Sequence, residues 1–95
     1  MAAYVIVQIE TEDAGLMARY REIAAPVVAQ YGGRYIVRGG ALQVLEGDWQ
    51  PKRLVVLEFD TAEQARRWWD SAEYAGPKAM RQRAGRTQML LIEGV

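Results

Sequence analysis

The 95-residue chain contains neither cysteine nor histidine. The lack of cysteine excludes disulfides, a thiolate nucleophile and cysteine-ligated metals. The lack of histidine excludes Ser-His-Asp catalysis, histidine-ligated haem and most zinc sites. We therefore expect no metal and no cofactor, and any proton transfer must use Glu, Asp, Tyr, Lys or Arg.

The chain also lacks a charge imbalance and long apolar runs. Lys and Arg total 12, as do Asp and Glu, so the formal net charge is zero. This balance argues against nucleic acid or an anionic membrane as the main partner. No apolar run approaches the roughly 20 residues of a membrane span, and Met1–Tyr4 lacks the basic region of a signal peptide. The expected location is the cytoplasm.

What is present is enough apolar material for one small domain. Hydrophobic residues make up 51% of the chain, which is too many for a disordered segment. The length predicts a single domain over residues 1–95. A chain this short buries a smaller share of its surface than a large domain does, so a modestly stable monomer is expected.

Hydrophobic periodicity predicts strands and helices in the order βαββαβ. The expected strands are 3–9, 34–46 with an interruption at Gly39-Gly40, 53–59 and 87–93. Three helices are expected. The first runs from Thr11 or Asp13 to about Tyr31, the second begins at Asp60 or Thr61, and the third runs from Ser71 to near Gly85. This order favours an α+β, ferredoxin-like fold: a four-stranded antiparallel sheet with the helices on one face.

Several residues predict where these elements begin, bend and end. Gly32-Gly33 is expected to stop the first helix, because glycine accepts the left-handed C-cap conformation. Gly39-Gly40 suggests a β-bulge more than a ligand loop. Pro77 suits the first turn of the last helix. The expected buried stripe of the first helix is Leu16, Tyr20, Ile23, Val27 and Tyr31.

Strand alternation divides the apolar residues between two sheet faces. The set expected to meet the helices is Val5, Val7, Ile9, Val55, Leu57, Phe59, Leu90 and Ile92. The opposite set is Tyr4, Ile6, Leu54, Val56, Met89 and Leu91, mixed with Gln8, Glu58 and Glu93. That second face is too apolar to meet water alone. We therefore expect a homodimer with its sheets packed face to face, with the polar members lining a cavity or pairing at the seam.

Taken together, several motifs resemble the DUF1330 family of small bacterial proteins. They are YGGRYIVRGG at 31–40, LEGDWQPKR at 45–53, VLEF at 56–59 and WWDSAEY at 68–74, followed by Arg81. The resemblance implies a dimeric α/β barrel of unknown function. Its superfamily includes antibiotic-biosynthesis monooxygenases, haem-degrading enzymes, chlorite dismutase-like proteins and lactone isomerases. Members that rely on a catalytic or haem-ligating histidine find no counterpart here.

Arg38 is the first candidate site residue. An arginine next to Gly39 and Gly40 could anchor a carboxylate, because glycines let a ligand approach the backbone. An ion pair between Arg38 and Glu58 on the neighbouring strand is the more ordinary interpretation. A similar cross-strand pair is expected between Glu46 and Arg53.

Other candidates have equally ordinary alternatives. Glu58 or Tyr74 could move a proton, although Tyr74 could simply pack on a tryptophan. Ser71 could border a ligand but suits a helix N-cap better. Trp68 is expected to form core and pocket wall, and Arg81 completes the candidate ligand-binding set.

Two functions remain open on this evidence. The first is a cofactor-free enzyme acting on a small carboxylate or apolar acid near Arg38 and Glu58. The alternative is a non-catalytic dimeric module that binds a small molecule or serves a stress response. Neither involves nucleic acid or a membrane.

Overall fold

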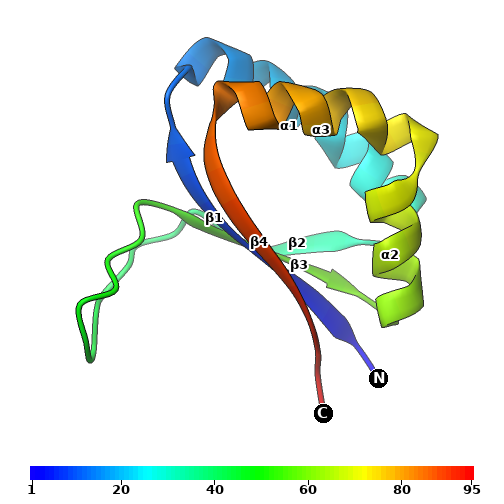
Figure 1. The fold of residues 1–95 in the computed structure, drawn as a ribbon. Coiled ribbons are helices and arrows are strands. Elements are labelled where there is room, and N and C mark those ends of the chain that lie inside the picture. The colour runs from blue at the N-terminus through cyan, green and yellow to red at the C-terminus, as the bar shows by residue number, and fades with distance from the viewer.

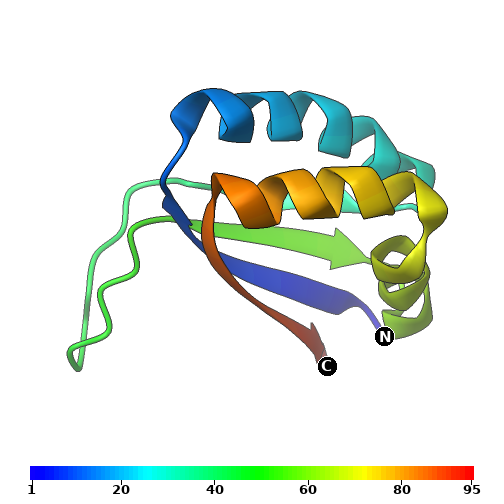
Figure 2. The ribbon, with the colours of Figure 1, turned by 45° about the horizontal axis from the view of Figure 1, so that its top comes forward.

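The computed structural model describes all 95 residues as four strands and three helices (Figure 1). The elements are β1 (Ala3–Thr11), α1 (Ala14–Gln30), β2 (Arg34–Arg38), β3 (Leu54–Phe59), α2 (Ala62–Asp70), α3 (Ala72–Ala84) and β4 (Gly85–Glu93). The strands form one antiparallel sheet in the order β2-β3-β1-β4. The ferredoxin-like prediction is confirmed, and α1 and α3 lie side by side over one face of the sheet (Figure 2). None of the helices has the length and hydropathy of a bilayer-spanning segment.

Helix α1 ends at the predicted double glycine. Gly32 has a φ of 79°, the left-handed conformation that glycine adopts without steric cost. The Gly32 N–H donates to the carbonyl of Ala29, and the Gly33 N–H donates to that of Val28. This pair of bonds is the Schellman motif, so the helix stop is confirmed.

The two later helices begin at predicted N-caps. The hydroxyl of Thr61 accepts a hydrogen bond from the Gln64 N–H, and that of Ser71 accepts one from the Tyr74 N–H, both at 3.1 Å. Pro77 was misplaced by the prediction, because it lies inside α3 beyond the first turn. Ser71 therefore starts a helix that continues past Pro77 to Ala84.

The buried stripe of α1 differs from the prediction. Its buried residues are Met17, Ala24 and Val28, whereas Ile23 is 42% exposed. Four of the five predicted residues, Leu16, Tyr20, Val27 and Tyr31, are partly buried against the core, so the prediction fails only at Ile23. The physical reason is that α1 packs along α3 as well as over the sheet, so the most buried positions each lie one residue after a predicted one.

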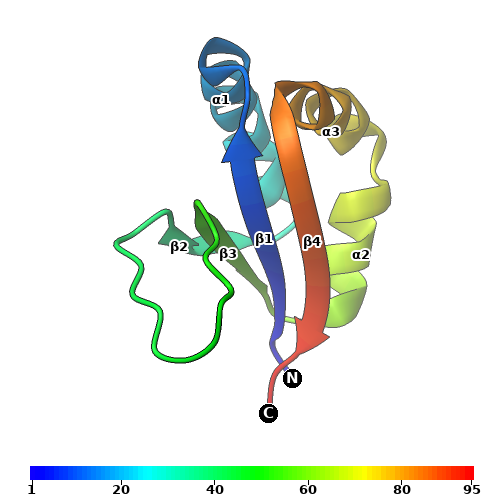
Figure 3. The ribbon, with the colours of Figure 1, turned by 60° about the vertical axis from the view of Figure 1, so that its left-hand side comes forward.

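Residues 39–53 form a loop that projects away from the body (Figures 1 and 3). The predicted strand over 42–46 is wrong, because β2 ends at Arg38 and this part of the chain is exposed. Gly39-Gly40 is not the bulge either. Gly39 closes the strand end with a φ of 69° and donates its N–H to the Leu54 carbonyl. The register shift lies between Tyr35 and Val37.

The predicted faces of β1 and β3 are confirmed, and that of β4 is reversed. Val7 lies opposite Met89, so Met89 faces the helices. Leu90 and Ile92 instead lie on the face opposite the helices, 62% and 53% exposed. Because Met89–Ile92 is apolar at four consecutive positions, alternation in the sequence could not tell the faces apart. We call the helix-free side the open face; it carries Tyr4, Ile6, Leu54, Val56, Leu90 and Ile92.

Candidate functional site

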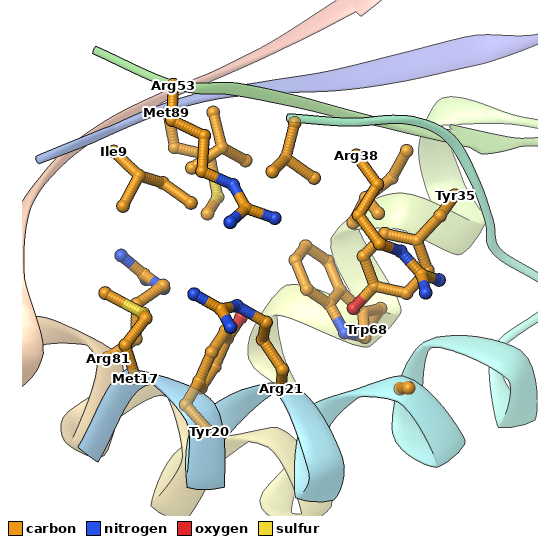
Figure 4. A pocket seen from close by; sticks show the side chains of 14 residues that line it. Ile9, Met17, Tyr20, Arg21, Tyr35, Arg38, Arg53, Trp68, Arg81 and Met89 are labelled. Carbon is orange, nitrogen blue, oxygen red and sulfur yellow. The ribbon is translucent and has the colours of Figure 1, made fainter. Parts of the chain in front are cut away.

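A cavity of about 70 Å³ lies between the helices and the sheet (Figure 4). Four arginines line it: Arg21 from α1, Arg38 from the end of β2, Arg53 just before β3, and Arg81 from α3. The rest of the lining is aromatic or aliphatic: Val7, Ile9, Met17, Tyr20, Ala25, Tyr35, Val55, Leu57, Trp68 and Met89. No carboxylate belongs to this lining, so the cavity combines apolar walls with positive charge.

The β2 bulge places Arg38 in this cavity. Without the bulge, alternation would put Arg34 and Arg38 on one face. The extra residue, Ile36, reverses the alternation, so Arg38 lies opposite Val55 on the helix-facing side. There its guanidinium lies 4.1 Å from the centre of the Tyr35 ring, a cation–π distance.

Glu58 lies on the open face and does not reach the cavity. Its carboxylate accepts a hydrogen bond from Arg34 Nε at 2.9 Å. The predicted ion pair between Arg38 and Glu58 is therefore wrong, because the bulge separates these side chains onto opposite faces. The structure does not bring Glu58 together with Tyr74.

Arg53 enters the cavity beneath Gly39. A Cβ on Gly39 would lie 2.7 Å from Arg53 Nε, so the glycine leaves room for the arginine. That Nε is buried without a hydrogen-bond partner. Burial lowers the pKa of Arg53, and the charges of Arg21 and Arg38 lower it further. The predicted pair with Glu46 is wrong, because Glu46 lies in the exposed loop and makes no salt bridge.

A hydrogen-bonded group links α1 and α3 beside the cavity. The hydroxyls of Tyr20 and Tyr74 are 2.7 Å apart, and Arg81 Nε donates to the Tyr74 hydroxyl at 3.3 Å. Arg81 is only 3% exposed and also donates to the Thr87 hydroxyl. Burial raises the pKa of Tyr20 far above its ordinary value, and Tyr74 raises it further. Tyr20 therefore stays protonated at neutral pH and cannot act there as a base.

The remaining predicted site residues fall into distinct positions. Trp68 lines the cavity, 1% exposed, with its ring centre 4.3 Å from that of Tyr74. The Ser71 hydroxyl caps α3 and donates to the Trp68 carbonyl, so its role is structural. Gly40 has open space around it. Arg38, Trp68 and Arg81 thus line the cavity. Tyr74 is outside the lining but contacts Tyr20, Trp68 and Arg81, which belong to it, and Gly39 leaves room for Arg53.

Sequence reasoning missed Arg21 and Arg53. A signal existed for Arg53, which shares the alternation of Val55 and Leu57 and so belongs on the helix-facing side. Arg21 follows Met17 by four residues, a helical spacing that places both on one side of α1.

None of the four cavity arginines makes a salt bridge. Three other arginines are paired: Arg34 with Glu58 and Asp60, Arg67 with Glu63, and Arg86 with Glu12. The remaining three, Arg19, Arg66 and Arg83, are also unpaired but do not line the cavity. A chain of zero net charge thus concentrates positive charge at one concave site, which is suited to bind an anion. The structure contains no group of three or more side chains placed to hold a metal ion.

A second hollow of about 310 Å³ runs between α2 and β4. Trp68 and Met89 border both hollows, whereas Trp69, Leu90 and Leu91 belong to the second alone. Its one charged lining residue is Arg66, which is exposed. The arginine-lined cavity is the better candidate site, because it combines apolar walls with converging polar groups.

The fold and cavity define a small ferredoxin-like α+β protein with an arginine-lined cavity between its helices and its sheet. The chain belongs to the DUF1330 family, described as a domain of unknown function, whose model matches residues 2–95. Comparison with curated proteins gives no match.

Solved structures share the fold at low sequence identity. A protein of unknown function from Rhodopseudomonas palustris has a TM-score of 0.79 at 15% identity, over 99% of this chain and 82% of that one. A dimeric ferredoxin-like protein of unknown function from Jannaschia sp. has a TM-score of 0.67 at 16% identity, over 99% and 100%. SnoaB, a cofactor-independent oxygenase from Streptomyces nogalater, has a TM-score of 0.66 at 11% identity, over 98% and 92%. At these identities the likeness is one of fold.

Proposed function

We propose that the arginine-lined cavity binds a small organic acid. The observation that carries this proposal is the set of four arginines without a carboxylate partner, inside an otherwise aromatic and aliphatic lining. A carboxylate would supply the missing counter-charge, and the body of the acid would pack on the apolar walls.

The chemistry of the lining fits such a ligand. Guanidinium groups present donors in a planar fork that matches a carboxylate, and Arg53 Nε is a buried donor with no partner. Tyr35 and Trp68 offer aromatic surface to the body of the acid. The volume of about 70 Å³ is several times the roughly 10–15 Å³ that a single water requires.

Binding without proton transfer is the reading that the geometry favours. The cavity holds no carboxylate or histidine to act as a base, and Tyr20 stays protonated. Cofactor-free catalysis on the bound acid is the second candidate, favoured by the hydrogen-bonded group of Tyr20, Tyr74 and Arg81. The fold that this chain shares with the cofactor-independent oxygenase SnoaB is compatible with that candidate. The test is to incubate the protein with benzoate under air. Conversion of the benzoate to a compound of different mass, seen by mass spectrometry, would favour catalysis.

We also propose that the protein is a homodimer whose two open faces pack together. The exposed Leu90 and Ile92 continue the apolar surface of Tyr4, Ile6 and Val56 across the sheet. A second copy would cover this surface, and the relative from Jannaschia sp. is described as dimeric.

Binding can be tested by calorimetric titration with benzoate at neutral pH. Replacing Arg53 with methionine keeps the length of the side chain but removes its charge, so the dissociation constant should rise about 10–100-fold, the loss of one charge-assisted hydrogen bond. Arg67→Met is the matched control, because Arg67 is exposed on α2 and lines neither hollow, and it should bind like the wild type. Equal weakening in both variants, or none in Arg53→Met, would contradict the proposal.

A further inference from the structure

We propose that the ligand is a dianion, whose doubly charged group is held by Arg21, Arg38 and Arg53 together. The inference rests on the proposed function and narrows it to a chemical class: phosphate monoesters and paired carboxylates attached to a compact apolar group. Within this class the shared feature is two negative charges on neighbouring oxygens.

The three arginines come from different elements and reach the same cavity. The Arg53 side chain points from the sheet toward Arg21, which extends from α1 (Figure 4). Arg38 lies beside Tyr35. After burial, the charges of Arg21 and Arg38 both contribute to lowering the pKa of Arg53. None of the three donates to a protein carboxylate.

Charge balance favours two negative charges over one. A monoanion would leave two guanidinium charges of this group uncompensated at one cavity, where Arg21 and Arg38 are exposed and Arg53 Nε is buried. Like charges gathered at one site repel one another, and a second negative charge reduces that repulsion. A dianion compensates two of the three and offers more acceptor oxygens to the fork-shaped donors. Arg81 has fewer free donors for the ligand, because Tyr74 and Thr87 already accept hydrogen bonds from it.

The effect of the ligand's charge on affinity can be measured by changing the pH, because the side chains that line the cavity keep their charge over the range used. The titratable side chains in the lining are Tyr20, Tyr35, Arg21, Arg38, Arg53 and Arg81. Tyrosine and arginine ordinarily titrate near pH 10 and above pH 12, and burial raises the pKa of both Tyr20 and Tyr35. With no histidine in the chain, a change in affinity between pH 5 and pH 8 reports the ligand.

Phenyl phosphate and benzoate provide the test. A phosphate monoester gains its second charge with a pKa of about 6, whereas benzoate is a monoanion throughout. Calorimetric titration in phosphate-free buffer should show phenyl phosphate binding on the order of tenfold more tightly at pH 8 than at pH 5, with benzoate unchanged. Phthalate, a paired carboxylate, should exceed benzoate by a similar factor at pH 8; comparing it with phenyl phosphate tells which dianion is preferred.

The outcomes separate this inference from the proposed function. If benzoate binds and neither phenyl phosphate nor phthalate gains from its second charge, the dianion inference is overturned while organic-acid binding stands. If none of the three ligands binds, both fail. In Arg21→Met the gain of phenyl phosphate with pH should shrink while benzoate still binds, and in Arg67→Met the gain should persist. An undiminished gain in Arg21→Met and Arg38→Met alike would overturn the assignment to these arginines.

Discussion

Gly85→Ala is expected to lower the free energy of unfolding by about 3 kcal/mol, at the upper end of overpacking effects. Gly85 begins β4 opposite Thr11, directly after α3. A Cβ there would overlap the carbonyl oxygen of Glu10 and lie 3.1 Å from the Cα of Thr11. Both are backbone atoms of β1, so neither can move without disturbing the central strand. The Gly85 backbone is extended, so the penalty is steric rather than torsional.

Urea denaturation at one fixed protein concentration measures this effect, because dimerisation would make stability depend on concentration. Gly15→Ala is the matched control. Gly15 lies in the first turn of α1, where a Cβ would make only an ordinary contact of 3.7 Å with Asp13 Oδ1, and alanine there should stabilise the protein by about 0.5–1 kcal/mol. A Gly85→Ala protein as stable as the wild type would contradict the close contact between Gly85 and the backbone of β1.

Leu90→Lys is expected to convert the proposed homodimer into a monomer at micromolar concentration. Leu90 lies on the open face and is 62% exposed in the single chain, so the isolated fold should tolerate lysine. In a two-fold dimer each substitution occurs twice, and the lysines would bury charge against apolar surface, which is costly without a partner.

Sedimentation equilibrium distinguishes the two states. The wild type should sediment at twice the chain mass and Leu90→Lys at the chain mass. Ile23→Lys is the control, since Ile23 is also partly exposed but lies on α1, away from the open face; it should remain dimeric. A wild-type monomer at micromolar concentration would contradict the dimer.

The fold could be predicted from the sequence because several local signals agree. Alternating apolar residues in β1 and β3, the caps at Thr61 and Ser71, and the stop at Gly32 all specify the same element order. The prediction of the β4 faces failed because this strand has no alternation of apolar and polar residues. Its four consecutive apolar residues fit either face. It also failed over 42–46, because a strand-like pattern forms no strand without a neighbour to pair with.

The site was harder to predict because it depends on the parity of one strand. A single extra residue, Ile36, moves Arg38 from the face of Glu58 to the face of the cavity. The sequence shows no separate mark for that bulge. It therefore could not predict that Arg38 and Glu58 lie on opposite faces of the sheet. Trp68 and Arg81 were placed in the ligand-binding set and do line the cavity, while their role in binding stays a prediction.

The central claim, that the arginine-lined cavity binds an organic acid, is tested most directly by the indole signals of the tryptophans in a ¹H–¹⁵N correlation spectrum. The chain has three tryptophans: Trp68 lines the cavity, Trp69 borders the second hollow, and Trp49 lies in the loop, where its Nε1 donates to Gln8. Titration with benzoate should shift the Trp68 signal in a saturable manner, by more than that of Trp69, while Trp49 stays in place. A saturable shift confined to Trp49 or Trp69, or no shift in any of the three, would contradict the claim.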